Sequence, residues 1–245
     1  MKLVRIWRDE TCPSPREWDN LGTMVCWHRK YYLGDRHDYR NPEDFWYELA
    51  EKVVGDTGRV EAMTPERREK VVRENAIVLP LYLYDHGGLR MNTTGFSCSW
   101  DSGQVGWIYV LKEKVREEYG VKRITRDVYD RVLTVLRAEV EDYDRWLRGE
   151  VYGFTVYEVV GGDIVSVDSC AGFYGSDPRE NGILGEVPDG LQEPLRRVSY
   201  LRDGLVVTET GAELEGREIR RFLLERGLLP GCVLEKCDIL RGLCA

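Results

Sequence analysis

The chain has 245 residues, of which 42% are hydrophobic, and it carries 35 basic and 43 acidic side chains. This length and apolar content suffice for a buried core, which excludes a wholly disordered chain. The formal charge of −8 disfavours a general nucleic-acid binder, although it leaves room for a local basic patch. The same acidity permits an alternative, a DNA mimic that presents carboxylates to a DNA-binding partner.

Residues 1–9 alternate polar and apolar side chains, which predicts a first strand rather than a secretory signal. No apolar run approaches the roughly 18 residues that cross a bilayer, so we expect no membrane-spanning helix. Cysteines without a secretory signal indicate reduced thiols and a cytoplasmic protein. There are seven of them, namely Cys12, Cys26, Cys98, Cys170, Cys232, Cys237 and Cys244.

Helix-start chemistry occurs twice in the first third of the chain. Asn41-Pro42-Glu43-Asp44 predicts a helix to about residue 54, and Thr64-Pro65-Glu66 predicts a second one to about residue 75. Residues 77–85 are apolar on both faces and predict a buried strand, in which Pro80 implies a bulge or an edge position. We also expect strands at 23–28, 89–97 and 105–111 and a helix at 112–119.

The clearest element is a long amphipathic helix at about 125–147. Its apolar residues recur at spacings mostly of three and four, namely Val128, Val132, Val135, Leu136, Val140, Tyr143 and Leu147. Strands at 151–160 and 164–169 then form a hairpin through Gly161-Gly162-Asp163. Gly, Pro and charged residues follow residue 176, up to a short helix at 215–226.

These elements predict an α+β fold, in which a mostly antiparallel sheet is covered by the long helix and by shorter ones. The grouping of strands with interspersed helices lacks the regular alternation of a parallel sheet. We expect a main domain at 1–175 and a C-terminal subdomain or appendage at 176–245.

Three segments are dense in polar and aromatic residues: 14–28 (SPREWDNLGTMVCWH), 96–106 (FSCSWDSGQVG) and 168–175 (DSCAGFYG). Together they resemble a family of uncharacterised proteins encoded by bacteriophages and mobile elements. The resemblance covers roughly residues 1–180 and implies an accessory role in the host cell, such as interference with host defence. It supplies no catalytic residues. Ala171 departs from the bulky aromatic residue expected in the third segment.

Binding without catalysis is the working hypothesis, with a host protein or a small ligand as the partner. Polar and aromatic side chains in glycine-containing loops are typical of such sites. The candidates are Trp18, Asp19, His28, Asp85, His86, Cys98, Trp100, Asp101, Gln104, Asp168 and Ser169. No phosphate-binding or dinucleotide-binding glycine loop is present, so no cofactor is predicted. The oligomeric state stays open.

An enzyme is the alternative, namely a cysteine-dependent hydrolase or transferase. Antiparallel pairing could bring His86 near Cys98, and a thiolate next to a base is the nucleophile of such enzymes. Asp101 or Gln104 would then orient the base or stabilise an oxyanion. The plainer interpretation is that Cys98 packs in the core and His86 lies in a turn.

Cys26, His28 and His37, with Asp35 nearby, have the atom types of zinc ligands. No Cys-x-x-Cys or His-x-x-x-His pair supports them, so no metal is predicted, and the three C-terminal cysteines lack an evident fourth ligand. An acidic run on the long helix is interpreted as a solvated face. It consists of Glu139, Glu141, Asp142 and Asp144.

Overall fold

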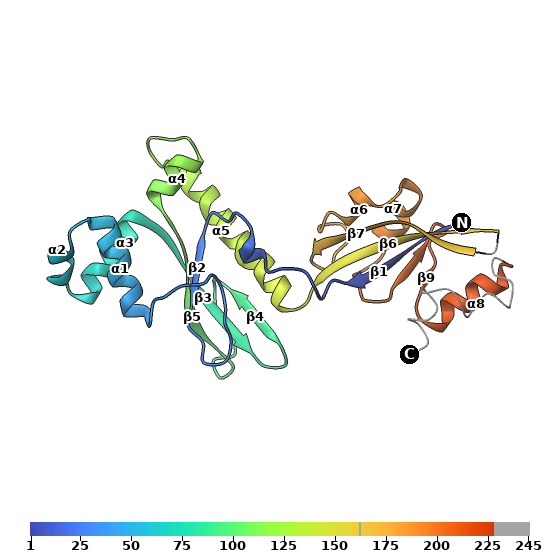
Figure 1. Cartoon of the computed structure of the whole chain (residues 1–245), viewed down its shortest axis with the longest axis horizontal. Helices are drawn as coiled ribbons and strands as arrows, with labels where there is room; N and C mark the ends of the chain where they lie inside the picture. Colours follow the sequence, from blue (N-terminus) through green and yellow to red (C-terminus); the bar gives the residue numbers. More distant parts are fainter. Residues whose placement is uncertain (162, 228–245) are drawn as a thin grey trace. The chain divides into compact units, whose positions relative to one another are not determined.

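The computed structural model describes residues 1–161 and 163–227, and these form two compact units (Figure 1). One unit joins Met1–Cys12 to the chain from Gly149 onward, and the other is Pro13–Arg148. Two antiparallel sheets, one in each unit, and the helices that pack on them confirm the predicted α+β fold. No helix in the described part of the chain is long and apolar enough to cross a membrane.

The first unit is built on a five-stranded sheet of order β7-β6-β1-β8-β9. The strands are β1 (Lys2–Arg8), β6 (Val151–Val160), β7 (Asp163–Tyr174), β8 (Val206–Thr208) and β9 (Glu213–Leu214). β1 pairs with β6 on one side and with β8 on the other. This unit therefore spans the boundary that was expected near residue 175. The reason is that β1 pairs with β6, which precedes residue 175, and with β8, which follows it.

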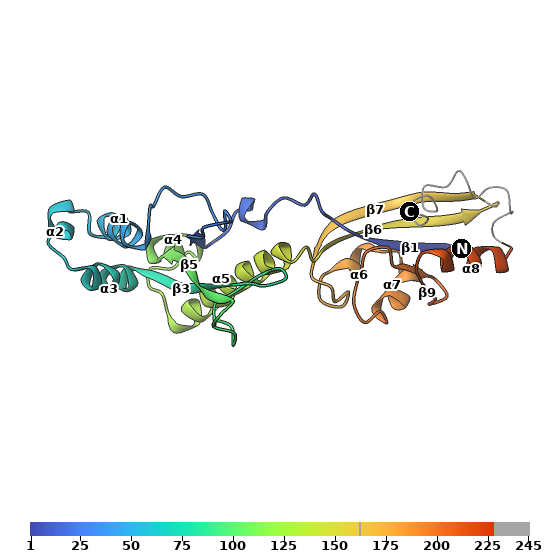
Figure 2. The same cartoon turned by 90° about the horizontal axis from the view of Figure 1, so that it is seen from below.

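Two short helices cover one face of this sheet, α6 (Ile183–Glu186) and α7 (Asp189–Arg196), as Figure 2 shows. Leu191 and Leu195 lie four residues apart on α7 and are fully buried with Val4 and Ile6 of β1. A further helix, α8 (Arg217–Glu225), buries Ile219 and Leu223 against Leu3. Only α8 was predicted, since Pro188, Pro194 and several glycines obscure the helical pattern of the others.

The second unit contains a four-stranded sheet of order β2-β5-β3-β4. The strands are β2 (Thr23–Cys26), β3 (Ala76–Asp85), β4 (Leu89–Asn92) and β5 (Ser102–Leu111). The first part of β3 packs on both faces, as predicted, with Ile77 and Leu79 in one apolar cluster and Ala76 and Val78 in another. The register with β5 shifts between Leu81 and Tyr82, directly after Pro80, and β4 pairs with β3 only from Tyr82 onward. Both features meet the expectation for a proline in a strand.

Helices lie on both faces of this sheet. The long helix α5 (Arg126–Leu147) packs on one face and buries Val132, Leu136 and Val140 against β3 and β5. On the other face lie α1 (Pro42–Val54) and α3 (Pro65–Asn75), whose N-caps Asn41 and Thr64 are the predicted ones. Shorter helices are η1 (Pro15–Glu17), α2 (Thr57–Glu61) and α4 (Lys112–Glu118).

Candidate functional site

Three chain segments leave or enter the second unit's sheet at the same end. β3 ends at Asp85, β5 begins at Ser102 beside it, and β2 ends at Cys26, opposite Gly106 of β5. The Asp85 amide donates to the Asp101 carbonyl at 2.9 Å and locks the first two segments together. This antiparallel arrangement brings loop 27–38, the turn at His86 and loop 93–101 to the same end of the sheet.

Asp101 joins the two residues expected to carry catalysis. Its Oδ2 accepts from the Cys98 thiol at 3.4 Å, and its Oδ1 lies 3.6 Å from Nδ1 of His86. The hydroxyl of Ser102 donates to the Cys98 carbonyl and holds the loop closed. The Asp101 carboxylate therefore contacts both the thiol and the imidazole and lies between them. Among the described residues, no hydrogen bond joins His86 to Cys98.

Loop 27–38 adds two stacked rings to this edge. The imidazole of His28 and the phenol of Tyr31 lie 5.0 Å apart at an interplanar angle of 7°. Tyr31 donates from its hydroxyl to Asp85 at 3.4 Å, and Lys30 lies 4.0 Å from the same carboxylate. A hydrogen bond with Tyr31, and after it the nearby charges, raise the pKa of the Lys30 ammonium. Three segments of the chain are thus linked by polar contacts at this end of the sheet.

We call this group of residues the sheet-end cluster: His28, Tyr31, Asp85, His86, Cys98 and Asp101. Trp100 stands next to it with 96% of its surface exposed, and Tyr32 is likewise fully exposed. Large aromatic side chains in water are typical of binding surfaces, where their burial on association supplies much of the affinity. Gln104, also a candidate, lies exposed on β5 and donates only to the Gly106 carbonyl at 3.3 Å.

A cavity of about 1070 Å³ opens beside the cluster and is lined by loop residues between Cys26 and Asp38. His28 and Tyr31 belong both to this lining and to the cluster. His37 forms part of the wall, with Nε2 at 3.0 Å from the Cys26 carbonyl. Its Nδ1 is buried and has no hydrogen-bond partner among the described residues. The cavity has the size of a site for a small molecule.

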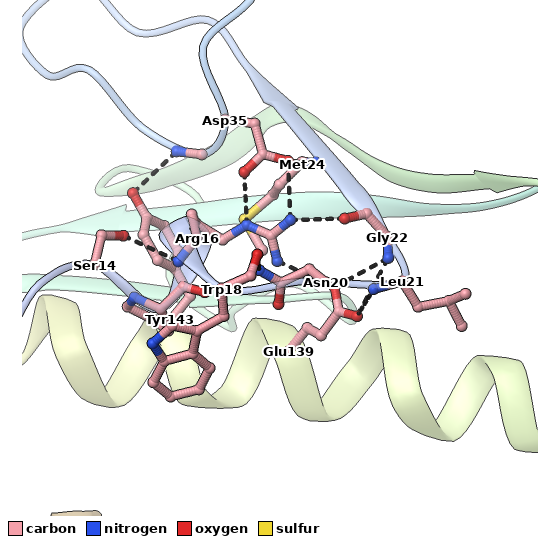
Figure 3. Close-up of polar contacts among 12 residues, drawn as sticks. Ser14, Arg16, Trp18, Asn20, Leu21, Gly22, Met24, Asp35, Glu139 and Tyr143 are labelled. Carbon is pink, nitrogen blue, oxygen red and sulfur yellow. Dashed lines mark hydrogen bonds and ion pairs between the residues drawn. The ribbon is translucent and has the colours of Figure 1, made fainter. Parts of the chain in front are cut away.

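The first motif contains an ion-pair network that sequence reasoning missed (Figure 3). Arg16 has only 4% of its side chain exposed, and its guanidinium donates twice to Asp35, at 2.8 and 2.9 Å, and once to Glu139 of α5 at 3.0 Å. A fourth hydrogen bond goes to the Gly22 carbonyl at 2.7 Å. Burial lowers and these carboxylates raise the pKa of Arg16, with a net rise.

Asp35 and Glu139 also hold the backbone of the same segment. Asp35 accepts from the Met24 amide at 2.8 Å, and Glu139 accepts from the Leu21 amide at 2.8 Å. The chain around β2 is therefore fixed on α5 by charged groups that are paired on every side. In the sequence, Arg16, Asp35 and Glu139 are charged residues that lie far apart. No local pattern indicates that these three side chains meet.

Trp18 and Asp19 follow this network and lie away from the sheet-end cluster. They line a separate hollow of about 470 Å³ with Lys114 and Glu118 of α4 and with α5. Figure 3 shows the Trp18 indole lying towards α5. Lys114 donates to the Asn20 carbonyl at 2.8 Å and ties this segment to α4.

Asp168 and Ser169 belong to the other unit, on edge strand β7. Ser169 donates from its hydroxyl to the Phe154 carbonyl at 2.9 Å, and Asp168 accepts from the Ser169 amide at 2.8 Å. The third motif therefore contributes nothing to the sheet-end cluster. Ala171, which departs from the expected aromatic residue, pairs with Gly153, where an added Cβ would lie 2.4 Å from the Trp7 ring.

The ligand types around Cys26 do not form a metal site. Burial raises the pKa of the Cys26 thiol to about 12, and the thiol packs in the core. His28 stacks on Tyr31 and Asp35 is engaged by Arg16. Within residues 1–161 and 163–227, no group of three such side chains is placed so that it could hold a metal ion. The described cysteines are free thiols, whereas Cys232, Cys237 and Cys244 lie outside the described residues.

The acidic run of α5 is not the solvated face that was predicted. Glu139 accepts from Arg16, and Asp144 is buried and accepts from the Met91 amide at 2.7 Å. Arg145 pairs with both remaining carboxylates, at 2.6 and 3.0 Å. Burial raises the pKa of Asp142 more than Arg145 lowers it. These four carboxylates have internal partners, so they offer little to a DNA-binding protein.

Protein-family models, curated proteins and solved structures were all compared with this chain, and none of them matches.

Proposed function

We propose that the chain is an accessory protein of a bacteriophage or mobile element that acts in the host cytoplasm by binding, as in interference with host defence. Its binding site is the sheet-end cluster with Trp100, and the partner is a host protein or a small ligand. The observation that carries this proposal is the exposure of Trp100, at 96%, beside a network that already holds its own polar groups in place.

Two physical features favour binding at this edge. Asp85 and Asp101 are fixed by hydrogen bonds from neighbouring segments, so a partner meets preorganised acceptors and loses little entropy in ordering them. Trp100 and Tyr32 present rings that are free to be covered, which is the usual composition of an interface centre. The resemblance of the three motifs to phage proteins supports the accessory role.

The test compares Trp100→Ala with Tyr200→Ala, which removes an exposed aromatic ring from the other unit. Each variant is used as bait for host lysate and is assayed for the cellular phenotype of the wild-type protein. We expect Trp100→Ala to lose partners and phenotype that Tyr200→Ala retains. Equal behaviour of the two variants, with both folded, would refute the assignment of the site.

A cysteine-dependent hydrolase or transferase is the second candidate, because Asp101 contacts both Cys98 and His86. The thiol faces the carboxylate, however, whereas a cysteine nucleophile needs the imidazole to take its proton. Iodoacetamide at neutral pH distinguishes the two functions. Rapid alkylation confined to Cys98 and abolished by His86→Ala would favour the enzyme, and slow alkylation unaffected by that change would favour the binding protein.

A further inference from the structure

The loop that lines the 1070 Å³ cavity differs in charge from the rest of the chain. Residues 28–40 contain four basic and two acidic residues together with two of the three histidines, in a protein of net charge −8. Within the lining itself the charged side chains are Arg29, Arg36, Asp35 and Asp38, and Asp35 is already paired with the buried Arg16. The loop is therefore richer in basic groups than the acidic protein as a whole.

Two arginines in the cavity lining are available to an anion. Arg29 and Arg36 are exposed, and no ion pair joins either of them to another described residue. A guanidinium group donates several hydrogen bonds in one plane, which matches the oxygens of a phosphate. Arg40, by contrast, is paired with Asp44 at 2.7 Å and lies outside the lining.

The same lining carries flat rings that are already held in place. His28 and Tyr31 are stacked, His28 accepts from the Lys30 amide at 3.3 Å, and the Tyr31 hydroxyl donates to Asp85. Trp27, Tyr32 and His37 also contribute to the wall. Aromatic rings next to basic groups are the combination that binds a nucleobase and its phosphate, because every base has a face that stacks.

We propose that this cavity binds a nucleotide, with the base against the rings of His28 and Tyr31 and the phosphate on Arg29 and Arg36. The inference rests on the proposed binding function and names the class of its small ligand. A free nucleotide fits the cavity volume, and the acidic remainder of the chain disfavours a long nucleic acid.

Isothermal titration calorimetry of the whole protein tests this with ATP, AMP, adenosine, inorganic phosphate and a single-stranded ten-residue oligothymidylate. We expect ATP or AMP to bind more tightly than adenosine or phosphate alone, since only the nucleotides use both halves of the site. Arg29→Ala/Arg36→Ala should weaken nucleotide binding at least about tenfold, as each lost hydrogen bond to a charged group is worth a factor of this order. His28→Ala should weaken it as well.

The matched control is Arg67→Ala/Arg137→Ala, which removes the same charge from two exposed arginines of the same unit that do not line the cavity. It should bind like the wild type. Absence of nucleotide binding up to about 1 mM, equal loss in both double variants, or binding of the oligonucleotide alone would each overturn the proposal. If nucleotides fail while Trp100→Ala still loses its partners, this inference alone is wrong.

Discussion

The first and second motifs both combine charged and aromatic residues, but they are used in opposite ways. In the first motif, Arg16 is buried between Asp35 and Glu139 and is paired with both carboxylates. In the second, Trp100 lies in solvent and the Asp101 side chain remains about one-third exposed between Cys98 and His86. One motif holds the unit together, whereas the other leaves an aromatic ring and a carboxylate exposed to solvent.

This difference teaches that a dense polar segment is not by itself a site. A buried ion pair repays the cost of desolvation only if all its members are present, so the first motif is intolerant of change for structural reasons. An exposed ring contributes little to folding and a great deal to an interface. The two motifs should therefore respond differently to substitution, in stability for one and in binding for the other.

The largest effect is expected for Arg16→Met, which keeps much of the aliphatic stem and removes the charge. Asp35 and Glu139 would remain buried without their common partner, which costs roughly 3–5 kcal/mol of unfolding free energy. Urea denaturation of the wild type and the variant, followed by tryptophan fluorescence, measures this loss.

The control for this variant is Arg137→Ala on the exposed side of α5, for which we expect a change within about 0.5 kcal/mol. A double-mutant cycle with Glu139→Gln separates the pair from the rest of the network, and the two changes should not be additive. Comparable stability of Arg16→Met and Arg137→Ala would contradict the structural role assigned to the first motif.

A moderate effect is expected at alkaline pH from Cys26, a buried residue of the first motif. Burial, with a smaller contribution from Asp35, raises its thiol pKa from near 9 to about 12. Between these values the unfolded chain has released a proton that the folded chain retains, so the free energy of unfolding falls as the pH rises. The fall from this group approaches about 1.4 kcal/mol per pH unit.

Unfolding free energies measured from pH 8 to 11 for wild type, Cys26→Ala and Cys98→Ala test this contribution. Cys26→Ala is expected to be less stable at pH 8, because it leaves a gap in the core, and to lose less stability as the pH rises. Cys98→Ala removes a partly exposed thiol from the same unit and should follow the wild-type curve. Parallel curves for Cys26→Ala and wild type would disprove the contribution of this thiol.

Local signals in the sequence were sufficient for most of the helices and for the longer strands. Asn41-Pro42 begins α1 and the side chain of Asn41 caps it at 2.9 Å, while the spacing of Val132, Leu136 and Val140 gives the buried face of α5. Elements defined by distant partners were missed. β8 is three residues long and exists because it pairs with β1, about 200 residues earlier in the chain.

The candidate site was predictable only in part. The sequence indicated a turn after His86 with Cys98 one hairpin later, but Asp85 and Asp101 come together because β3 also pairs with β5, on the side opposite β4. Trp18 and Asp19, and likewise Asp168 and Ser169, were grouped with them on composition alone and lie elsewhere. Composition reports which residues are polar, but only long-range pairing decides which of them meet.

The smallest effect on folding is expected for Trp100→Ala in the second motif. The ring is 96% exposed and lies in a loop whose shape is held by Asp101 and Ser102, so its removal should change the unfolding free energy by no more than about 0.5 kcal/mol. Urea denaturation alongside Arg16→Met gives the comparison directly. A loss above about 1 kcal/mol would mean that Trp100 packs on the protein itself, and the distinction between the two motifs would fail, because the exposed ring would then be part of the fold rather than a surface for a partner.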